Sequence, residues 1–206
     1  MKNTLLAMLC TVIFSFASFA QGQAKGDIEF GVNLGINGST AGNSNGTYDS
    51  GYGFNIGASG DYFFSDRWSL KLKVIYDQKG WDGLFVDAAD NFYEGHFNLN
   101  YVTVPVMANW HFGGKRNWYL NAGPYAGFLL GAKETERGDD YKDAFQSTDF
   151  GIALGIGVKI PLNDKLKLSL EYDEQTGLSE IYKTNDFKKI SNRRSSFNVG
   201  LNFLLK

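Results

Sequence analysis

The sequence predicts an all-β fold: an eight-stranded, antiparallel, up-and-down transmembrane β-barrel that follows an N-terminal signal peptide. Three observations carry this prediction. Apolar and polar residues alternate in eight segments, the connections between the segments alternate between long and short, and the polar face of most segments is rich in small residues. Alternation with a period of two is the pattern of a half-buried strand, and eight repetitions are hard to obtain by chance.

The first twenty residues predict an export signal. Lys2 supplies a positive start, the run LLAMLCTVIFSF is apolar, and small residues precede a cleavage point after Ala20. The run is too short to favour a spanning helix. We therefore expect residues 1–20 to be removed and residues 21–206 to form one outer-membrane β-barrel domain. Cys10 is the only cysteine, so the exported protein cannot form an intramolecular disulfide.

The eight predicted strands follow one another along the mature chain. Their ranges are 28–37, 51–64, 68–77, 98–112, 118–132, 149–162, 166–175 and 196–205. The sixth, DFGIALGIGVKIPL, shows the pattern most clearly, because large apolar residues occupy every second position from Phe150 to Leu162. Glycine, alanine and Lys159 fill most of the positions between them. A tilted barrel strand needs roughly 9–11 residues to cross the hydrocarbon layer, so these segments are long enough.

The connections between the strands also alternate. Short turns at 65–67, 113–117 and 163–165 separate long polar segments at 38–50, 78–97, 133–148 and 176–195. An even number of strands with short turns at one end and long loops at the other is typical of bacterial outer-membrane barrels. We therefore expect the short turns and both chain ends in the periplasm, and four long loops outside the cell.

The small residues indicate which face points inward. The lumen of an eight-stranded barrel is just wide enough for side chains to fill it, so the large apolar face must point to lipid. Charges on the inner face should then pair, and the short turns place Asp61 opposite Lys71 and Lys159 diagonal to Glu171. The predicted lumen charge network comprises Asp61, Lys71, Lys73, Lys159, Lys167 and Glu171. Asp77 and Asp173 are candidates to extend it.

Four segments carry a family resemblance. YVTVPVMANWHF (101–112), WYLNAGPYAGFLLG (118–131), DFGIALGIGV (149–158) and SSFNVGLNF (195–203) resemble the outer-membrane β-barrel domain of Bacteroidota, whose members are often labelled PorT-like or porin family proteins. The resemblance covers nearly the whole mature chain. Thr103 departs from the family's inward glutamate, and the chain ends in Lys206 instead of an aromatic residue. The resemblance implies an integral outer-membrane location, with outer-membrane lipid and the outer-membrane assembly machinery as partners.

Few residues are candidates for chemistry. The histidines are His96 and His111, and neither has a serine nearby in sequence to activate as a nucleophile. The acidic segments DAADN (87–91) and RGDDYKD (137–143) lack the ligand spacing of a calcium loop. A net charge of −2 provides no basic surface for nucleic acid. We therefore predict no catalytic residue, no cofactor and no bound metal.

The long loops are the predicted site of function. Residues 176–195 include Lys188, Lys189, Arg193 and Arg194, which we expect to bind the phosphates of lipopolysaccharide through charge-assisted hydrogen bonds. The sequence favours a non-enzymatic structural or surface-interaction role through the four outer loops, because loops on a rigid scaffold often carry binding. Two alternatives stay open: a narrow porin for small solutes and a lipid-modifying outer-membrane enzyme.

Overall fold

The computed structural model describes residues 23–43, 46–86, 92–136, 138–184 and 189–205. The predicted signal peptide, the acidic segment 87–91 and Lys188 lie outside this range. The strands are β1 (Ile28–Asn43), β2 (Gly46–Thr47), β3 (Asp49–Phe63), β4 (Trp68–Val86), β5 (Phe92–Phe112), β6 (Trp118–Glu134), β7 (Thr148–Pro161), β8 (Leu166–Gly177) and β9 (Ser191–Leu205). A short 3₁₀ helix, η2 (Lys142–Ala144), precedes β7.

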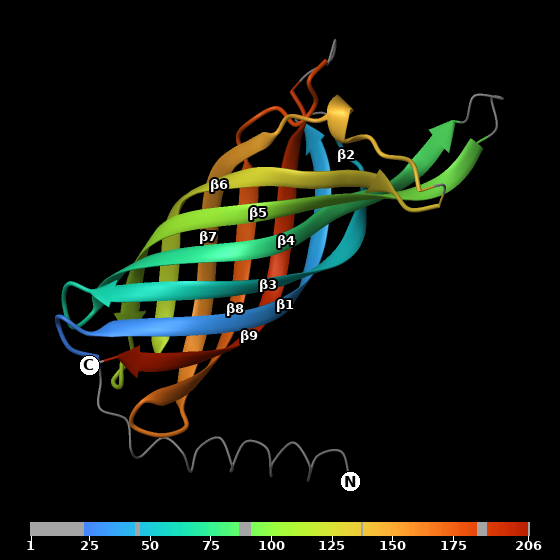
Figure 1. Cartoon of the computed structure of the whole chain (residues 1–206). Helices are drawn as coiled ribbons and strands as arrows, with labels where there is room; N and C mark the ends of the chain where they lie inside the picture. The colour runs from blue at the N-terminus through green and yellow to red at the C-terminus, as the bar shows by residue number, and fades with distance from the viewer. Residues whose placement is uncertain (1–22, 44–45, 87–91, 137, 185–188, 206) are drawn as a thin grey trace, which may run out of the picture.

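The strands form one closed antiparallel barrel. Each long strand pairs with the next along the chain, and β9 pairs with β1 to complete the ring (Figure 1). The two-residue strand β2 pairs only with the end of β1, so the ring contains the eight predicted strands. Ring closure leaves no open sheet edge within the barrel wall. The backbone N–H and C=O groups therefore form hydrogen bonds with neighbouring strands where no water is present. No helix among the described residues is long and apolar enough to span a bilayer.

The registers predicted across two of the short turns are confirmed. Asp61 lies opposite Lys71 in the β3–β4 pair. Gly157 lies opposite Glu171 in the β7–β8 pair, which leaves Lys159 diagonal to Glu171. Because side chains alternate with a period of two, these registers also fix which residues of each strand point into the lumen.

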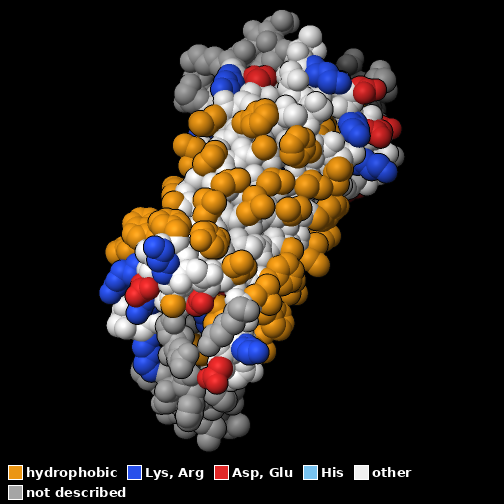
Figure 2. Space-filling view, turned by 60° about the vertical axis from the view of Figure 1, so that its left-hand side comes forward, with side chains coloured by type: hydrophobic (Ala, Val, Ile, Leu, Met, Phe, Trp, Pro, Cys, Tyr) orange, Lys and Arg blue, Asp and Glu red, His pale blue; other side chains and the backbone are white. Residues whose placement is uncertain are grey.

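The large apolar side chains point out of the barrel, as predicted. In β7, Phe150, Ile152, Leu154 and Ile156 are 51, 47, 53 and 43% exposed, whereas Lys159 between Val158 and Ile160 is 1% exposed. Figure 2 shows hydrophobic side chains covering the middle of the barrel, with charged side chains gathered at its two ends. An apolar exterior with a polar interior is the arrangement expected of a barrel that spans lipid.

The strands nearest the predicted outer loops are longer than the sequence indicated. The segment 78–97, predicted to be a loop, is largely a continuation of β4 and β5, which pair as far as Val86 and Phe92. The prediction failed here because polar residues such as Gln78 and Asp82 replace the apolar outer face beyond the membrane. In Figure 1 this hairpin projects beyond the ring of the barrel.

Both described chain ends lie beside the short turns. The Gly26 N–H donates to the Phe63 carbonyl at 2.7 Å, and the Leu204 N–H donates to the Lys165 carbonyl at 2.8 Å. Outward-facing tryptophans on the neighbouring strands β4, β5 and β6 lie at the same end of the barrel. The ring centroids of Trp68 and Trp110 are 6.3 Å apart. Such a girdle of aromatic rings is typical of the membrane–water interface.

Cysteine substitutions in β7 test the orientation of the side chains. A nitroxide attached to Leu154→Cys is expected to collide freely with oxygen dissolved in the lipid, because this position points outward. Ala153→Cys, which points into the filled lumen, should react with the label only after unfolding. Electron paramagnetic resonance on the protein in lipid vesicles measures both. Free labelling at 153 together with no oxygen access at 154 would contradict the orientation.

Candidate functional site

The lumen is filled by ion pairs. Within the described residues, ten close charge contacts join six basic and six acidic side chains in the barrel. The basic ones are Lys71, Lys73, Lys79, Lys159, Lys167 and Arg194, and the acidic ones are Glu29, Asp61, Asp77, Asp149, Glu171 and Asp173. All twelve are buried. The equal numbers leave these twelve groups without net charge when all are ionised.

Ten of these side chains form one continuous column in which positive and negative groups alternate. Their order is Lys167, Glu29, Lys159, Asp61, Lys71, Glu171, Lys73, Asp173, Arg194 and Asp77. The Nζ atom of Lys159 lies 3.2 Å from an Asp61 oxygen, and the Nζ atom of Lys71 lies 3.2 Å from a Glu171 oxygen. Burying a charge is costly unless an opposite charge and hydrogen bonds compensate, and alternation provides this along the column.

Small residues make room for the column. A Cβ atom at Gly31 would lie 2.6 Å from the Asn202 Oδ1 and Ser59 Oγ atoms, and a Cβ at Gly157 would collide with the Tyr119 ring. The hydroxyl of Tyr119 donates to Glu171 at 2.6 Å. The glycines on the polar faces of the strands therefore leave the space in which long charged side chains cross the barrel.

The structure brings the predicted lumen residues together but changes one pairing. Lys159, predicted to reach Glu171 on the next strand, instead pairs with Glu29 and Asp61. Glu171 is occupied by Lys71 and Lys73 from β4. The narrow lumen allows long side chains to meet across the barrel, so the diagonal neighbour on the adjacent strand is not the partner.

Sequence reasoning missed four members of the lumen network: Glu29, Lys79, Asp149 and Arg194. Glu29, Lys79 and Asp149 were not in the predicted network, although each stands at an inward position of an alternating strand. Glu29 and Asp149 lie inside the predicted strands 28–37 and 149–162, and Lys79 lies two residues beyond the predicted end of its strand. Assigning every charge on the polar face of a predicted strand to the lumen would have identified Glu29 and Asp149, and extending the alternation by two residues would have identified Lys79.

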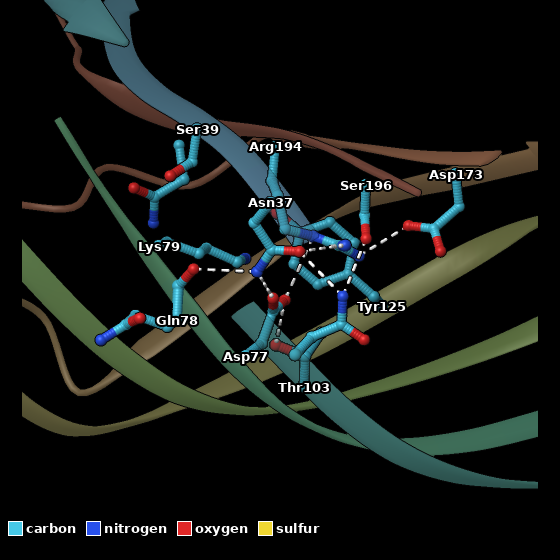
Figure 3. Close-up of polar contacts among 12 residues, drawn as sticks. Asn37, Ser39, Asp77, Gln78, Lys79, Thr103, Tyr125, Asp173, Arg194 and Ser196 are labelled. Carbon is cyan, nitrogen blue, oxygen red and sulfur yellow. Dashed lines mark hydrogen bonds and ion pairs between the residues drawn. The ribbon is translucent and has the colours of Figure 1, made fainter. Parts of the chain in front are cut away.

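The prediction for Arg194 is wrong. It was placed in an outer loop, but β9 begins at Ser191 and Arg194 points into the lumen. Its Nη2 atom lies 2.7 Å from an Asp173 oxygen and its Nε atom 3.3 Å from an Asp77 oxygen. Figure 3 shows Arg194 among these carboxylates and Asn37. A buried, paired guanidinium in this position is not available to lipopolysaccharide.

The two other described residues of that predicted set lie outside the lumen. Arg193 is exposed on the outer face of β9, and Lys189 is exposed in the preceding loop. The Lys189 ammonium donates to the Leu178 carbonyl, which uses one of its three donor hydrogens. Both residues lie at the end of the barrel opposite the short turns.

A second ion pair lies above the column. Lys79 and Asp149 are 3.2 Å apart. The carboxylate of Asp149 also accepts hydrogen bonds from Tyr125 at 3.2 Å, Asn192 at 3.1 Å and Ser179 at 3.0 Å. The Lys79 ammonium lies 4.9 Å from the centroid of the Tyr125 ring. The pair is therefore satisfied within the protein and leaves no obvious polar group for a ligand.

An apolar cap closes the outer end of the lumen. It contains Ala41, Trp81, Phe97, Leu99, Tyr101, Leu129, Ala132, Phe145 and Ile181, which are all buried. Phe145 and Ile181 come from two segments predicted to be solvated loops. These segments bond to each other, since the Gln146 N–H donates to the Ile181 carbonyl at 2.8 Å. Inward folding of outer loops depends on contacts between distant segments, so alternation did not predict it.

Tyr182 belongs to the edge of this cap. Its ring stacks on Phe145 with a centroid distance of 4.9 Å. Burial, with Tyr48 nearby, raises the pKa of the Tyr182 phenol above its ordinary value. The phenol therefore stays neutral at physiological pH, which suits its place against an apolar cluster.

The short-turn end of the lumen is closed by Phe63 and His111. Their ring centroids are 4.9 Å apart and both side chains are fully buried. Ser69, which is distant in sequence, lies 3.4 Å from the Nε2 atom of His111. The serine hydroxyl donates to Asp61 at 3.0 Å. A catalytic triad would place the carboxylate against the histidine and leave the serine accessible, so this geometry does not match one.

A cavity of about 20 Å³ lies between the column and the wall, lined by residues that include Asn33, Lys73, Ser169 and Asn198. This is room for about one water molecule. The arrangement is a plug of side chains.

Comparisons with known proteins agree with this architecture. The family model described as "Outer membrane protein beta-barrel domain" matches residues 19–183. OprG of Pseudomonas aeruginosa aligns in structure with a TM-score of 0.56 at 12% identity, over 90% of this chain and 99% of that chain. No curated protein matches the sequence.

Two further structures align less closely. Neisserial surface protein A gives a TM-score of 0.49 at 16% identity, over 84% of this chain and 96% of that chain. The N-terminal β-barrel domain of OprF from Pseudomonas aeruginosa gives a TM-score of 0.47 at 14% identity, over 89% of this chain and 100% of that chain. At 12% identity the likeness to OprG supports the fold alone.

Glu171→Gln tests the column. We expect it to lower the free energy of unfolding by about 3–5 kcal/mol, because Lys71 and Lys73 then lose their shared carboxylate while still buried. Denaturant unfolding of the protein in lipid vesicles, followed by heat-modifiable gel migration, measures the change. Glu174→Gln, on the exposed face of the same strand, is the control and should change stability by less than about 0.5 kcal/mol. Equal, small effects of both substitutions would contradict the buried column.

Proposed function

We propose that this chain, which belongs to the outer membrane protein beta-barrel domain family, is a closed, non-enzymatic barrel that acts through its outer surface. The protein is an integral outer-membrane barrel. The observation that carries the proposal is the sealed lumen, in which a neutral column of ion pairs is closed by aromatic side chains at both ends. A barrel without a passage leaves its loops and outer hairpin as the surfaces that can meet partners.

The sealed lumen disfavours the narrow porin. A solute would have to separate pairs such as Lys71–Glu171 and Arg194–Asp173. Each buried group would then lose its compensating charge, and breaking such a pair costs several kcal/mol. A conducting path also requires displacement of the cap around Phe145 and Ile181.

The two histidines do not favour the enzyme alternative. His111 and Ser69 are buried where a lipid substrate cannot reach them. The Nδ1 atom of His96 lies 2.5 Å from an Asp82 oxygen on the outer hairpin. Activation of a nucleophile would require a hydroxyl or thiol on the other side of that imidazole, and no described contact of His96 provides one.

The proposed orientation of the barrel is supported by the lengths of its connections. We infer that the short turns and both chain ends face the periplasm, because tight turns lie on that side in outer-membrane barrels. The outer-membrane assembly machinery is then the partner that inserts the chain. The segments quoted in the sequence analysis favour the Bacteroidota, PorT-like group within the family.

Lipopolysaccharide is the proposed lipid partner. Lys189 and Arg193 are exposed near the outer rim, at the level where phosphates of the outer leaflet would lie. Ammonium and guanidinium groups bind phosphate through charge-assisted hydrogen bonds. The original set of four is thus reduced to these two described residues, with Lys188 outside the described range.

Recording in planar bilayers tests the closed barrel. The purified protein, shown to be folded by heat-modifiable migration, is expected to give no stepwise conductance, because the ion-pair column blocks the lumen. A general porin reconstituted in the same bilayers serves as the positive control. Reproducible channels from folded protein would contradict the proposal and favour the porin.

Lipopolysaccharide binding is tested by a double substitution. Lys189→Gln with Arg193→Gln is expected to reduce co-purifying lipopolysaccharide severalfold, because two phosphate contacts are lost. The matched control is Lys115→Gln with Lys165→Gln, which removes two exposed charges at the opposite end of the barrel. Quantification of lipid A phosphate by mass spectrometry compares the two variants. Equal amounts in both would contradict a specific contact.

A further inference from the structure

The outer hairpin carries an open strand edge. Strand β6 ends at Glu134, and beyond it the Thr135 N–H donates to the His96 carbonyl at 3.0 Å. The chain then turns away, since the Gly138 N–H donates back to the Glu134 carbonyl. The outer part of β5, from Phe92 to Gly95, therefore continues with β4 on one side, and no strand among the described residues pairs with its other side. Figure 1 shows this hairpin projecting from the barrel.

The backbone direction at this edge follows from the last bond to β6. Successive residues of a strand point their N–H and C=O groups to alternate sides. Because the His96 carbonyl faces the β6 side, the N–H and C=O groups of Phe92 and Glu94 face the same side. Among the described residues no strand partner accompanies them there. These are the groups that a further strand would use.

Acidic side chains from three neighbouring strands and from Glu136 line a cleft next to the open edge. A cleft of about 480 Å³ is lined by Asp49, Asp82, Gly83, Glu94, Gly95, His96 and Glu136. The register places Asp49 beside Asp82 and Asp82 beside His96, in a row across three strands. The described lining contains four carboxylates and no lysine or arginine, so it is complementary to a cationic side chain.

The described part of this edge, residues 92–96, contains neither lysine nor proline. Exposed edges are commonly blunted by lysine, proline, a bulge or a covering loop. Here the described edge carries the aromatic side chain of Phe92, which is 76% exposed, and Glu94. An exposed ring, open backbone groups and a neighbouring acidic cleft together form a surface suited to an extended chain.

We propose that an extended, basic segment of a partner protein adds as a strand to the β5 edge at Phe92–His96. The backbone of this segment forms hydrogen bonds with the N–H and C=O groups of Glu94. One of its lysine or arginine side chains enters the acidic cleft. Strand addition provides affinity through main-chain hydrogen bonds, and side-chain pockets provide specificity. This inference rests on the proposed function, because it names the partner class for the outer surface.

The test uses the full protein in detergent micelles and a fluorescent eight-residue peptide that alternates arginine and valine. Fluorescence anisotropy is expected to show binding that weakens with salt. Glu94→Gln removes only the charge and should weaken binding severalfold. Glu94→Pro also removes the edge N–H, without removing a bond to β4, and should weaken binding about tenfold beyond Glu94→Gln.

Peptide variants complete the design. Methylation of the amides that face the edge should abolish binding, whereas methylation of the alternate set should preserve it, because only one side of an added strand pairs. A peptide with glutamate in place of arginine should not bind. Equal affinity for Glu94→Pro and Glu94→Gln would overturn strand addition in favour of simple charge attraction.

Two other outcomes would also overturn the inference. The first is absence of peptide binding to folded protein. The second is self-association that Glu94→Pro abolishes, detected by analytical ultracentrifugation, because the edge would then belong to a second copy of the chain. The bilayer recordings remain independent of these results. A barrel that gives no conductance in the bilayer and does not bind the peptide would overturn this inference while leaving the closed-barrel proposal intact.

Discussion

The structure depends on the pairing of every buried lumen charge with an opposite charge. The lumen holds six basic and six acidic side chains, and the cavity beside Lys71, Lys73 and Glu171 has room for about one water molecule. A single unpaired ammonium or carboxylate there would cost several kcal/mol, a large part of the stability of a small domain. Alternation of sign along the column meets this requirement without water. The glycines of the strands make this arrangement possible, because they leave the volume that the long charged side chains occupy.

This filled interior is the basis for the proposal that the protein acts through its outer end. The membrane requires an apolar exterior, and closure of the sheet provides hydrogen-bond partners for the backbone N–H and C=O groups. The lumen is occupied, and aromatic side chains close it near Phe63 and near Trp81. At the outer end, β4 and β5 continue past their neighbours, and the loops before β7 and β9 fold inward. A rigid, sealed barrel thereby presents a hairpin with an open edge to the surroundings.

Much of this fold could be predicted from alternation, because a period of two directly reports the two environments of a barrel strand. The short turns fixed local registers, so Asp61 opposite Lys71 was predictable. Contacts across the lumen were not, since they depend on barrel closure. Lys159 therefore meets Glu29 instead of its diagonal neighbour Glu171. Arg194 and the hairpin were misjudged for another reason: beyond the membrane the outer face becomes polar, so the alternation fades while the strand continues. The cap at Phe145 depends on contacts between loops. Loop sequences show no regular alternation from which such contacts could be predicted.

A double-mutant cycle between Glu29 and Lys159 tests the central claim most directly. These residues lie on β1 and β7, which do not pair, and their side chains meet only if the polar faces turn into one closed lumen. The cycle compares unfolding free energies of Glu29→Gln, Lys159→Met, the double variant and the original protein in lipid vesicles. The structure predicts a coupling energy of about 1–3 kcal/mol. Additive effects, with coupling within experimental error of zero, would contradict the paired lumen.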